Sequence, residues 1–141
     1  MSHLNLSSTD TSDNDLIEIG KNTSIEMLDL DCTDITDQGL AHLAPLKYLS
    51  QLRLKDNPQL TDACITHLTV FNWLELLHIE NTSITIDGMR RLLGKVKLET
   101  LIVGAELDEG IEALRQLSGE FPETEILVKG KCVIKGGAFQ T

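Results

Sequence analysis

The side chains that could do chemistry in this 141-residue chain are spread along it and form no recognisable catalytic set. The three cysteines, Cys32, Cys64 and Cys132, lie far apart without a CxxC pair, which disfavours disulfides and structural zinc. His42 and His67 take the same place in successive copies of a repeated phrase, but no carboxylate or thiol shares that place. No nucleophile–base pair or phosphate-binding glycine loop is found. The sequence therefore predicts a protein that is not an enzyme and that carries no metal or cofactor.

Charged side chains recur at a regular interval in the middle of the chain. Six of them fall on three short segments with the same alternating pattern: Asp29, Asp31, Arg53, Lys55, His78 and Glu80. If these segments are neighbouring strands, about 4.8 Å apart, opposite charges stand next to one another. The charges then either pair across the sheet, which stabilises it by about 0.2–1 kcal/mol per pair, or face a partner protein. Both interpretations are open at this point.

These segments belong to a phrase that is repeated along the chain, with copies beginning near residues 4, 28, 52, 77, 101 and 126. A fixed period of this size is typical of a solenoid, in which each unit buries its apolar side only against its neighbours. In the third copy, Leu52 and Leu54 alternate with polar residues, which predicts a short strand with both leucines inward. Thr61 is a favoured helix cap, and Ile65, Leu68 and Phe71 then form one apolar helical face. The sequence therefore predicts parallel strands on a concave side and helices on a convex side.

Two motifs within the phrase carry a resemblance to a known family. One is LxxLxL followed by a polar residue, as in Leu49, Leu52, Leu54 and Asn57, and the other is the run Ile35-Thr-Asp-Gln-Gly-Leu40. They resemble the leucine-rich repeat family in its T-D-x-G-L variant, which is similar to the cysteine-containing repeats beside F-boxes and to bacterial GALA-type effector repeats. The resemblance implies an α/β fold, a right-handed leucine-rich-repeat solenoid over residues 1–130, followed by a C-terminal tail over 131–141.

One position of the family motif departs from its usual residue. The family places Asn or Cys there to link neighbouring coils, whereas this chain has Thr9, Thr33, Asn57, Thr82 and Glu106. A threonine hydroxyl can still bond the backbone of a neighbouring loop, so we expect this ladder to continue through Thr82 and to weaken at Glu106.

Strand alternation predicts which side chains face outward on the concave side. The residues expected there, and expected to contact a partner protein, are Met27, Asp29, Asp31, Gln51, Arg53, Lys55, Leu76, His78, Glu80 and Ile102. Leu76, Ile102 and Leu127 are apolar where solvent is expected, and exposed apolar groups beside charges favour a protein contact. The alternative is that the tail, through Val133-Ile134 or Phe139, folds back and covers them.

Charge and composition narrow the choice of partner. The net charge is −10, and residues 1–50 hold nine acidic and two basic side chains, a net −7. This balance disfavours nucleic acid, whose phosphates need a positive surface, and favours a basic protein surface or simply solubility. No segment approaches the roughly 20 apolar residues of a membrane span, so no membrane partner is expected. An odd, unpaired set of cysteines predicts a reducing, cytoplasmic location, and the effector resemblance adds the case of a bacterial protein delivered into a host cell.

These observations together predict a non-enzymatic protein-interaction module that binds through its concave face. Such a module can act as an inhibitor or antagonist that masks the active site of its partner. The alternative is a bacterial effector or ubiquitin-ligase-type adaptor that recruits a partner enzyme. The first strand, near Leu4 and Leu6, has no capping element before it, which predicts self-association through that end or a partner that covers it.

Overall fold

The computed structural model describes residues 2–105 and 110–141, and within them the chain forms an eight-stranded sheet with helices between successive strands from β1 to β6. The elements run in the order β1 (His3–Asn5), α1 (Asp13–Ile19), β2 (Met27–Asp29), η1 (Gln38–Leu43), β3 (Gln51–Arg53), η2 (Asp62–Cys64), α2 (Ile65–Leu68), β4 (Leu76–His78), α3 (Ile86–Leu93), β5 (Thr100–Val103), α4 (Gly110–Glu120), β6 (Glu125–Val128), β7 (Cys132–Lys135) and β8 (Ala138–Phe139). The elements η1 and η2 are 3₁₀ helices. The fold is therefore α/β, as the sequence predicted.

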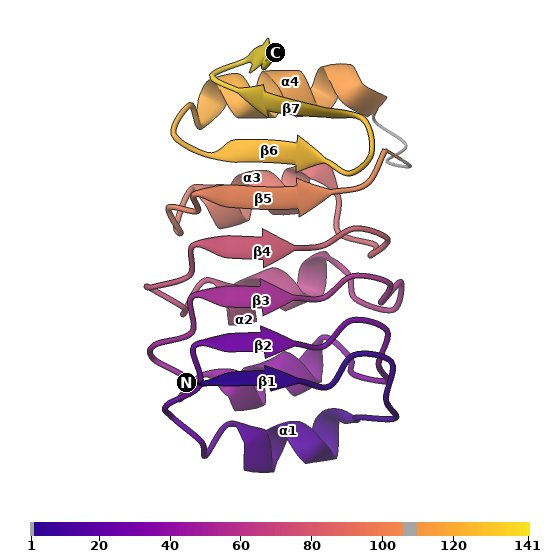
Figure 1. Cartoon of the computed structure of the whole chain (residues 1–141), viewed down its shortest axis with the longest axis vertical. Helices are drawn as coiled ribbons and strands as arrows, with labels where there is room; N and C mark the ends of the chain where they lie inside the picture. The colour runs from indigo at the N-terminus through magenta and orange to yellow at the C-terminus, as the bar shows by residue number, and fades with distance from the viewer. Residues whose placement is uncertain (1, 106–109) are drawn as a thin grey trace.

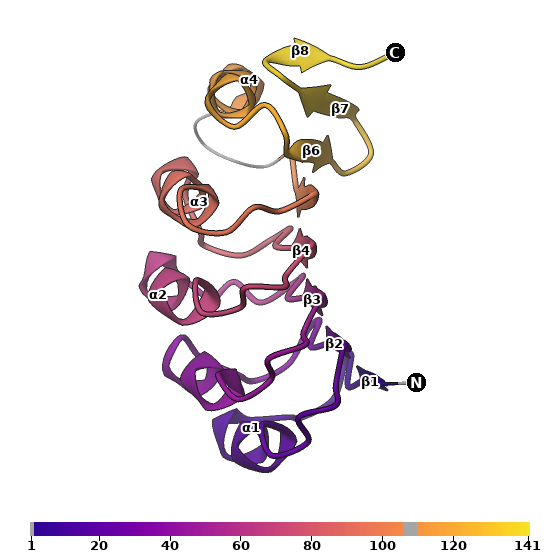
Figure 2. The same ribbon diagram turned by 90° about the vertical axis from the view of Figure 1, so that its left-hand side faces the viewer.

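The strands lie side by side in the order of the sequence, and β1 to β6 are parallel (Figure 1). All helices lie on one side of the sheet, and Figure 2 shows the strands following a shallow arc with the helices on its outer side. Equivalent leucines of successive copies stand in register, because Leu28 pairs with Leu52 and Leu52 pairs with Leu77. These inward side chains are buried, so each coil closes the core of the one before it.

An aspartate of one coil holds the threonine cap of the next helical segment. Asp62 accepts hydrogen bonds from the Thr85 backbone N–H at 2.8 Å and from the Thr85 hydroxyl at 2.6 Å. The same two-bond link joins residues 23 or 24 apart in two further pairs, Asp13 with Thr36 and Asp37 with Thr61. We call this series the Asp–Thr ladder. It explains why Thr and Asp recur together, since each pair ties two coils through a charged acceptor.

The recurring glycine has the same cause. A Cβ atom on Gly88 would stand 2.2 Å from Oδ1 of Asp62, and one on Gly39 would stand 1.9 Å from Oδ1 of Asp13. Real Cβ atoms do not approach so closely, so at these two rungs glycine leaves the room that the carboxylate occupies, whereas the Asp37–Thr61 rung forms beside a residue that has a Cβ atom. Cys64 takes the corresponding place in the third coil, and burial, with the charges of Asp37 and Asp62, raises the pKa of its thiol to about 12.

The expected threonine ladder is not the link between coils. The hydroxyls of Thr9, Thr33 and Thr82 each donate to a carbonyl three residues earlier in their own coil. Asn57, which is fully buried, does bridge, because its Nδ2 donates to Leu30 O at 2.9 Å and its Oδ1 accepts from the Thr33 N–H at 3.0 Å. The Thr33 hydroxyl also lies 3.5 Å from Oδ1 of Asn57 in the next coil, but none of these three hydroxyls bonds the backbone of a neighbouring coil, so that expectation was wrong for the three threonines. Glu106 lies outside the described residues.

The last segment of the chain extends the sheet. β7 pairs antiparallel with β6, and β8 pairs antiparallel with β7. Ile134 pairs with Ile126 and is fully buried, so it covers the end of the core, while Val133 pairs with Leu127 on the opposite side of the sheet. The tail therefore does not fold back over the strands, and the alternative in which it covers Leu76, Ile102 and Leu127 is wrong.

Candidate protein-binding face

The side of the sheet away from the helices, here called the strand face, carries the predicted contact residues. Its middle row runs in register across six strands, β2 to β7, through Asp29, Arg53, His78, Ile102, Leu127 and Val133. The first row pairs Met27, Gln51, Leu76, Thr100 and Glu125. The predicted rows are thus confirmed in their register, and this face looks toward the viewer in Figure 1.

The charged part of the strand face pairs with itself. The Arg53 guanidinium lies 3.0 Å from Oδ2 of Asp31 through Nη2 and 3.5 Å from Oδ2 of Asp29 through Nε. Asp31 also accepts the backbone N–H of Lys55 at 2.8 Å and is only 5% exposed. The expectation that Asp31 faces solvent was therefore wrong, because its carboxylate is enclosed by the next strand. Here the opposite charges of neighbouring strands pair with one another across the sheet, which is the first of the two interpretations that the sequence left open.

His78 is also buried, at 1% exposure, although strand alternation places it on the strand face. It stands between Arg53 and Ile102 in the middle row, and its Nε2 lies 3.2 Å from Oε1 of Glu80. Burial, together with the charge of Arg53, lowers the pKa of His78 below 6.5, against the opposing effects of Glu80 and Asp31. Among the residues that the structure describes, none is a hydrogen-bond partner of Nδ1 of His78. The expectation that His78 contacts solvent was wrong, since its row neighbours flank it on both sides.

The other part of the strand face is apolar. Ile102 pairs with Leu127, and Leu127 pairs with Val133, so three apolar side chains stand in one row across β5, β6 and β7. All three are half-buried, and Leu76, in the neighbouring row, is half-buried too. We call these four residues the apolar patch. Of the other predicted contact residues, Gln51 is exposed, and Met27, Lys55 and Glu80 are half-buried.

Sequence reasoning missed three residues that the structure places at a surface. Val133 joins the apolar row because β7 returns antiparallel, and Gly130 followed by the alternating segment Cys132–Lys135 was the available signal. Tyr48 and Trp73, the single tyrosine and the single tryptophan, are 60% and 66% exposed. Tyr48 directly precedes Leu49, Trp73 directly precedes Leu74, and both leucines are buried. The two aromatic residues therefore occupy equivalent places in their coils, three positions before the first-row residues of β3 and β4. Amphipathic aromatic rings are frequent anchors of protein contacts.

The part of the chain that the structure describes holds no group of three His, Cys, Asp or Glu side chains arranged to bind a metal ion. Over the same residues, no helix has the length and apolar character needed to cross a bilayer. No protein-family model matches the sequence, and no curated protein matches it significantly. Function is therefore inferred from the surfaces themselves.

Proposed function

We propose that the chain is a leucine-rich-repeat solenoid whose strand face binds a partner protein without catalysing a reaction. Two observations support the solenoid: equivalent positions of successive copies pair in register, and every helix lies on the same side of the sheet. Repeat stacks of this kind present extended, curved surfaces that are suited to recognising another macromolecule.

The apolar patch is the centre of the proposed contact, and it is the single observation that carries the proposal. Ile102, Leu127 and Val133 form a continuous apolar row that no described segment of the chain covers. Burial of such a row against a partner removes apolar surface from water, worth about 25 cal/mol per Å² before the entropy of association is subtracted. Apolar side chains at the centre with charged groups around them are the usual composition of a binding surface.

The charged part then serves as the rim. Because Arg53 already pairs with Asp29 and Asp31, these charges contribute little additional affinity for a partner. The net −7 of residues 1–50 acts at longer range and would speed the approach of a basic partner in a salt-dependent manner. A rigid face acts by occupying what it binds, so we propose masking of a partner's functional surface, as an inhibitor does, as the mode of action.

Two substitutions, each of which replaces a valine by lysine, test the proposal. Val133→Lys places a charge in the apolar patch, and Val70→Lys places the same charge at an exposed valine just after α2, on the helix side. Both variants should keep the circular dichroism spectrum of the wild type. In affinity capture with quantitative mass spectrometry, the partner should be retained by wild type and by V70K and lost by V133K.

A purified complex of that partner with wild type should then weaken at least tenfold for V133K and for Leu127→Lys, measured by calorimetry. A partner held equally well by V133K and V70K would refute the strand face as the binding site. Loss of the partner from both V133K and V70K would show that binding does not depend on this face in particular. That result would also refute the strand face as the binding site.

A further inference from the structure

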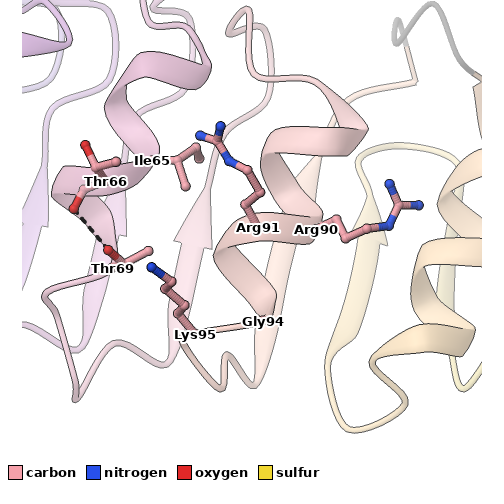
Figure 3. Close-up of a pocket in the computed structure, with 7 residues that line it drawn as sticks. All are labelled: Ile65, Thr66, Thr69, Arg90, Arg91, Gly94 and Lys95. Atoms are coloured by element: carbon pink, nitrogen blue, oxygen red, sulfur yellow. Dashed lines mark hydrogen bonds between the residues drawn. The ribbon is translucent and has the colours of Figure 1, made fainter.

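We propose that a groove on the helix side of the molecule binds a small organic anion, independently of the strand face. The groove lies between α2 and α3 and has a volume of about 290 Å³ (Figure 3). The residues that line it are Ile65, Thr66, Thr69, Arg90, Arg91, Gly94 and Lys95. This volume is at the lower end of the roughly 300–1,000 Å³ of small-molecule sites, so it suits a small molecule better than a protein segment.

Two cations point into this groove without a counter-ion. Figure 3 shows Arg91 and Lys95 reaching from the α3 side toward α2. Within the described residues, neither Arg91 nor Lys95 has a carboxylate at ion-pair distance. These two cations supply the attraction that an anionic group needs.

The neighbouring acidic and basic groups are engaged elsewhere. The Asp62 carboxylate is held by Thr85, and Arg91 instead donates to the neutral Asp62 carbonyl at 3.1 Å. Arg90 points away from the groove in Figure 3 and binds Glu120 through two nitrogens, at 2.8 and 3.1 Å. The charge of Arg91 is therefore left uncompensated while that of Arg90 is neutralised.

Two carbonyl groups at the end of α3, those of Arg90 and Leu92, accept backbone N–H groups of the turn that follows. Leu92 O accepts the backbone N–H of Lys95 at 3.0 Å and that of Val96 at 2.9 Å, and Arg90 O accepts the N–H of Gly94 at 3.0 Å. These bonds satisfy acceptors that a helix end otherwise exposes.

The walls suit a carbon body. The groove surface is mostly apolar, and Ile65, Thr66 and Thr69 line it on the α2 side. Gly94 leaves the space open, because a Cβ there would meet nothing closer than 3.4 Å. An amphipathic anion can contact both the cations and the apolar surface of the groove, whereas an inorganic ion can contact only the cations. The ligand class is therefore an apolar group bearing a carboxylate or phosphate.

The test is a titration of the ¹⁵N-labelled full chain with phenyl phosphate, followed by amide chemical shifts. The shifts should saturate with a Kd on the order of 1 mM, the range for a fragment of this size, and should map to Thr66, Thr69, Arg91 and Lys95. Inorganic phosphate and benzyl alcohol, which each lack one half of the probe, should bind at least tenfold more weakly.

Matched variants separate the groove from general charge effects. The double change Arg91→Gln and Lys95→Gln, and the groove-filling change Gly94→Leu, should each weaken phenyl phosphate at least tenfold. Lys47→Gln, at an exposed lysine elsewhere, and Gly119→Leu, in α4, should leave its Kd unchanged.

Shifts that fail to saturate, or that persist in the R91Q/K95Q double variant, would overturn the proposal. Inorganic phosphate binding as tightly as phenyl phosphate would reduce the site to bare charge attraction, and benzyl alcohol binding as tightly would reduce it to an apolar patch; either result refutes an organic-anion site. Because V133K changes the other side of the sheet, phenyl phosphate binding should survive it whatever becomes of the proposed protein contact.

Discussion

Replacing Gly88 by alanine should break one rung of the Asp–Thr ladder. The new Cβ would lie 2.2 Å from Oδ1 and 2.7 Å from Cγ of Asp62, closer than any van der Waals contact allows. The Asp62 side chain is the movable partner, so it swings aside and gives up its bonds to Thr85 N at 2.8 Å and Thr85 Oγ1 at 2.6 Å. Thr85 is also the N-cap of α3, so the loss of its bonds to Asp62 should weaken the start of that helix.

The magnitude follows from these contacts. Two hydrogen bonds to an ionised carboxylate in a half-buried setting are together worth about 2–3 kcal/mol. Alanine in a helix recovers about 0.5–1 kcal/mol relative to glycine. Gly88→Ala should therefore lower the free energy of unfolding by about 1–2.5 kcal/mol. In an Asp62→Ala background no carboxylate is displaced, so the same change should raise stability by about 0.5–1 kcal/mol, a coupling energy of about 2–3 kcal/mol.

Urea denaturation followed by far-ultraviolet circular dichroism measures all four members of this double-mutant cycle. Gly94→Ala is the control, because its Cβ would stand 3.4 Å from the nearest atom and its backbone is helical. That variant should be as stable as wild type or slightly more so. Equal destabilisation by G88A in the wild-type and D62A backgrounds would refute carboxylate displacement as the cause.

Two further predictions concern groups buried in the fold. Because burial lowers the pKa of His78 below its unfolded value of 6.5, protonation favours the unfolded state, and stability due to the neutral ring is lost as pH falls below 6.5. His78→Gln should remove this part of the pH dependence, at most about 1.4 kcal/mol per pH unit; identical urea midpoint shifts between pH 7.5 and 5.5 in both proteins would contradict it. Because Cys64 is fully buried with a pKa raised to about 12, a thiol reagent at pH 8 should modify Cys32 and then Cys132, and Cys64 only after unfolding. Modification of Cys64 at the rate of Cys32 in the native protein would show that its burial is not maintained.

The strand register could be predicted because one period controls it. Alternation places Leu52 inward and Arg53 outward, and a copy-to-copy spacing of 24 or 25 residues then aligns Asp29, Arg53 and His78. The period does not specify helix type. The coils after β2 and β3 contain the 3₁₀ helices η1 and η2, where a continuous apolar face suggested regular helices, although coils of similar length after β1 and β4 contain the α-helices α1 and α3.

Contacts between copies were harder to foresee than the pattern within one copy. The bonds that Thr85 donates to Asp62 span 23 residues, and in the sequence they show only as a recurring Thr and Asp and as the glycine that leaves room for the carboxylate. Burial of His78 depends on the size of its row neighbours, which alternation does not encode. The antiparallel return of β7 likewise follows a turn at Gly130, with φ of +73°, rather than the repeat.

Residues that recur in several copies and residues that change from copy to copy have different roles in this structure. The recurring Thr and Asp tie neighbouring coils together in the Asp–Thr ladder. The changing positions set the character of the strand face. In the middle row they pass from the paired charges of Asp29 and Arg53 to the apolar Leu127 and Val133. A partner that fits this row must therefore place its own apolar group toward β6 and β7, which fixes the direction in which it can lie across the strands.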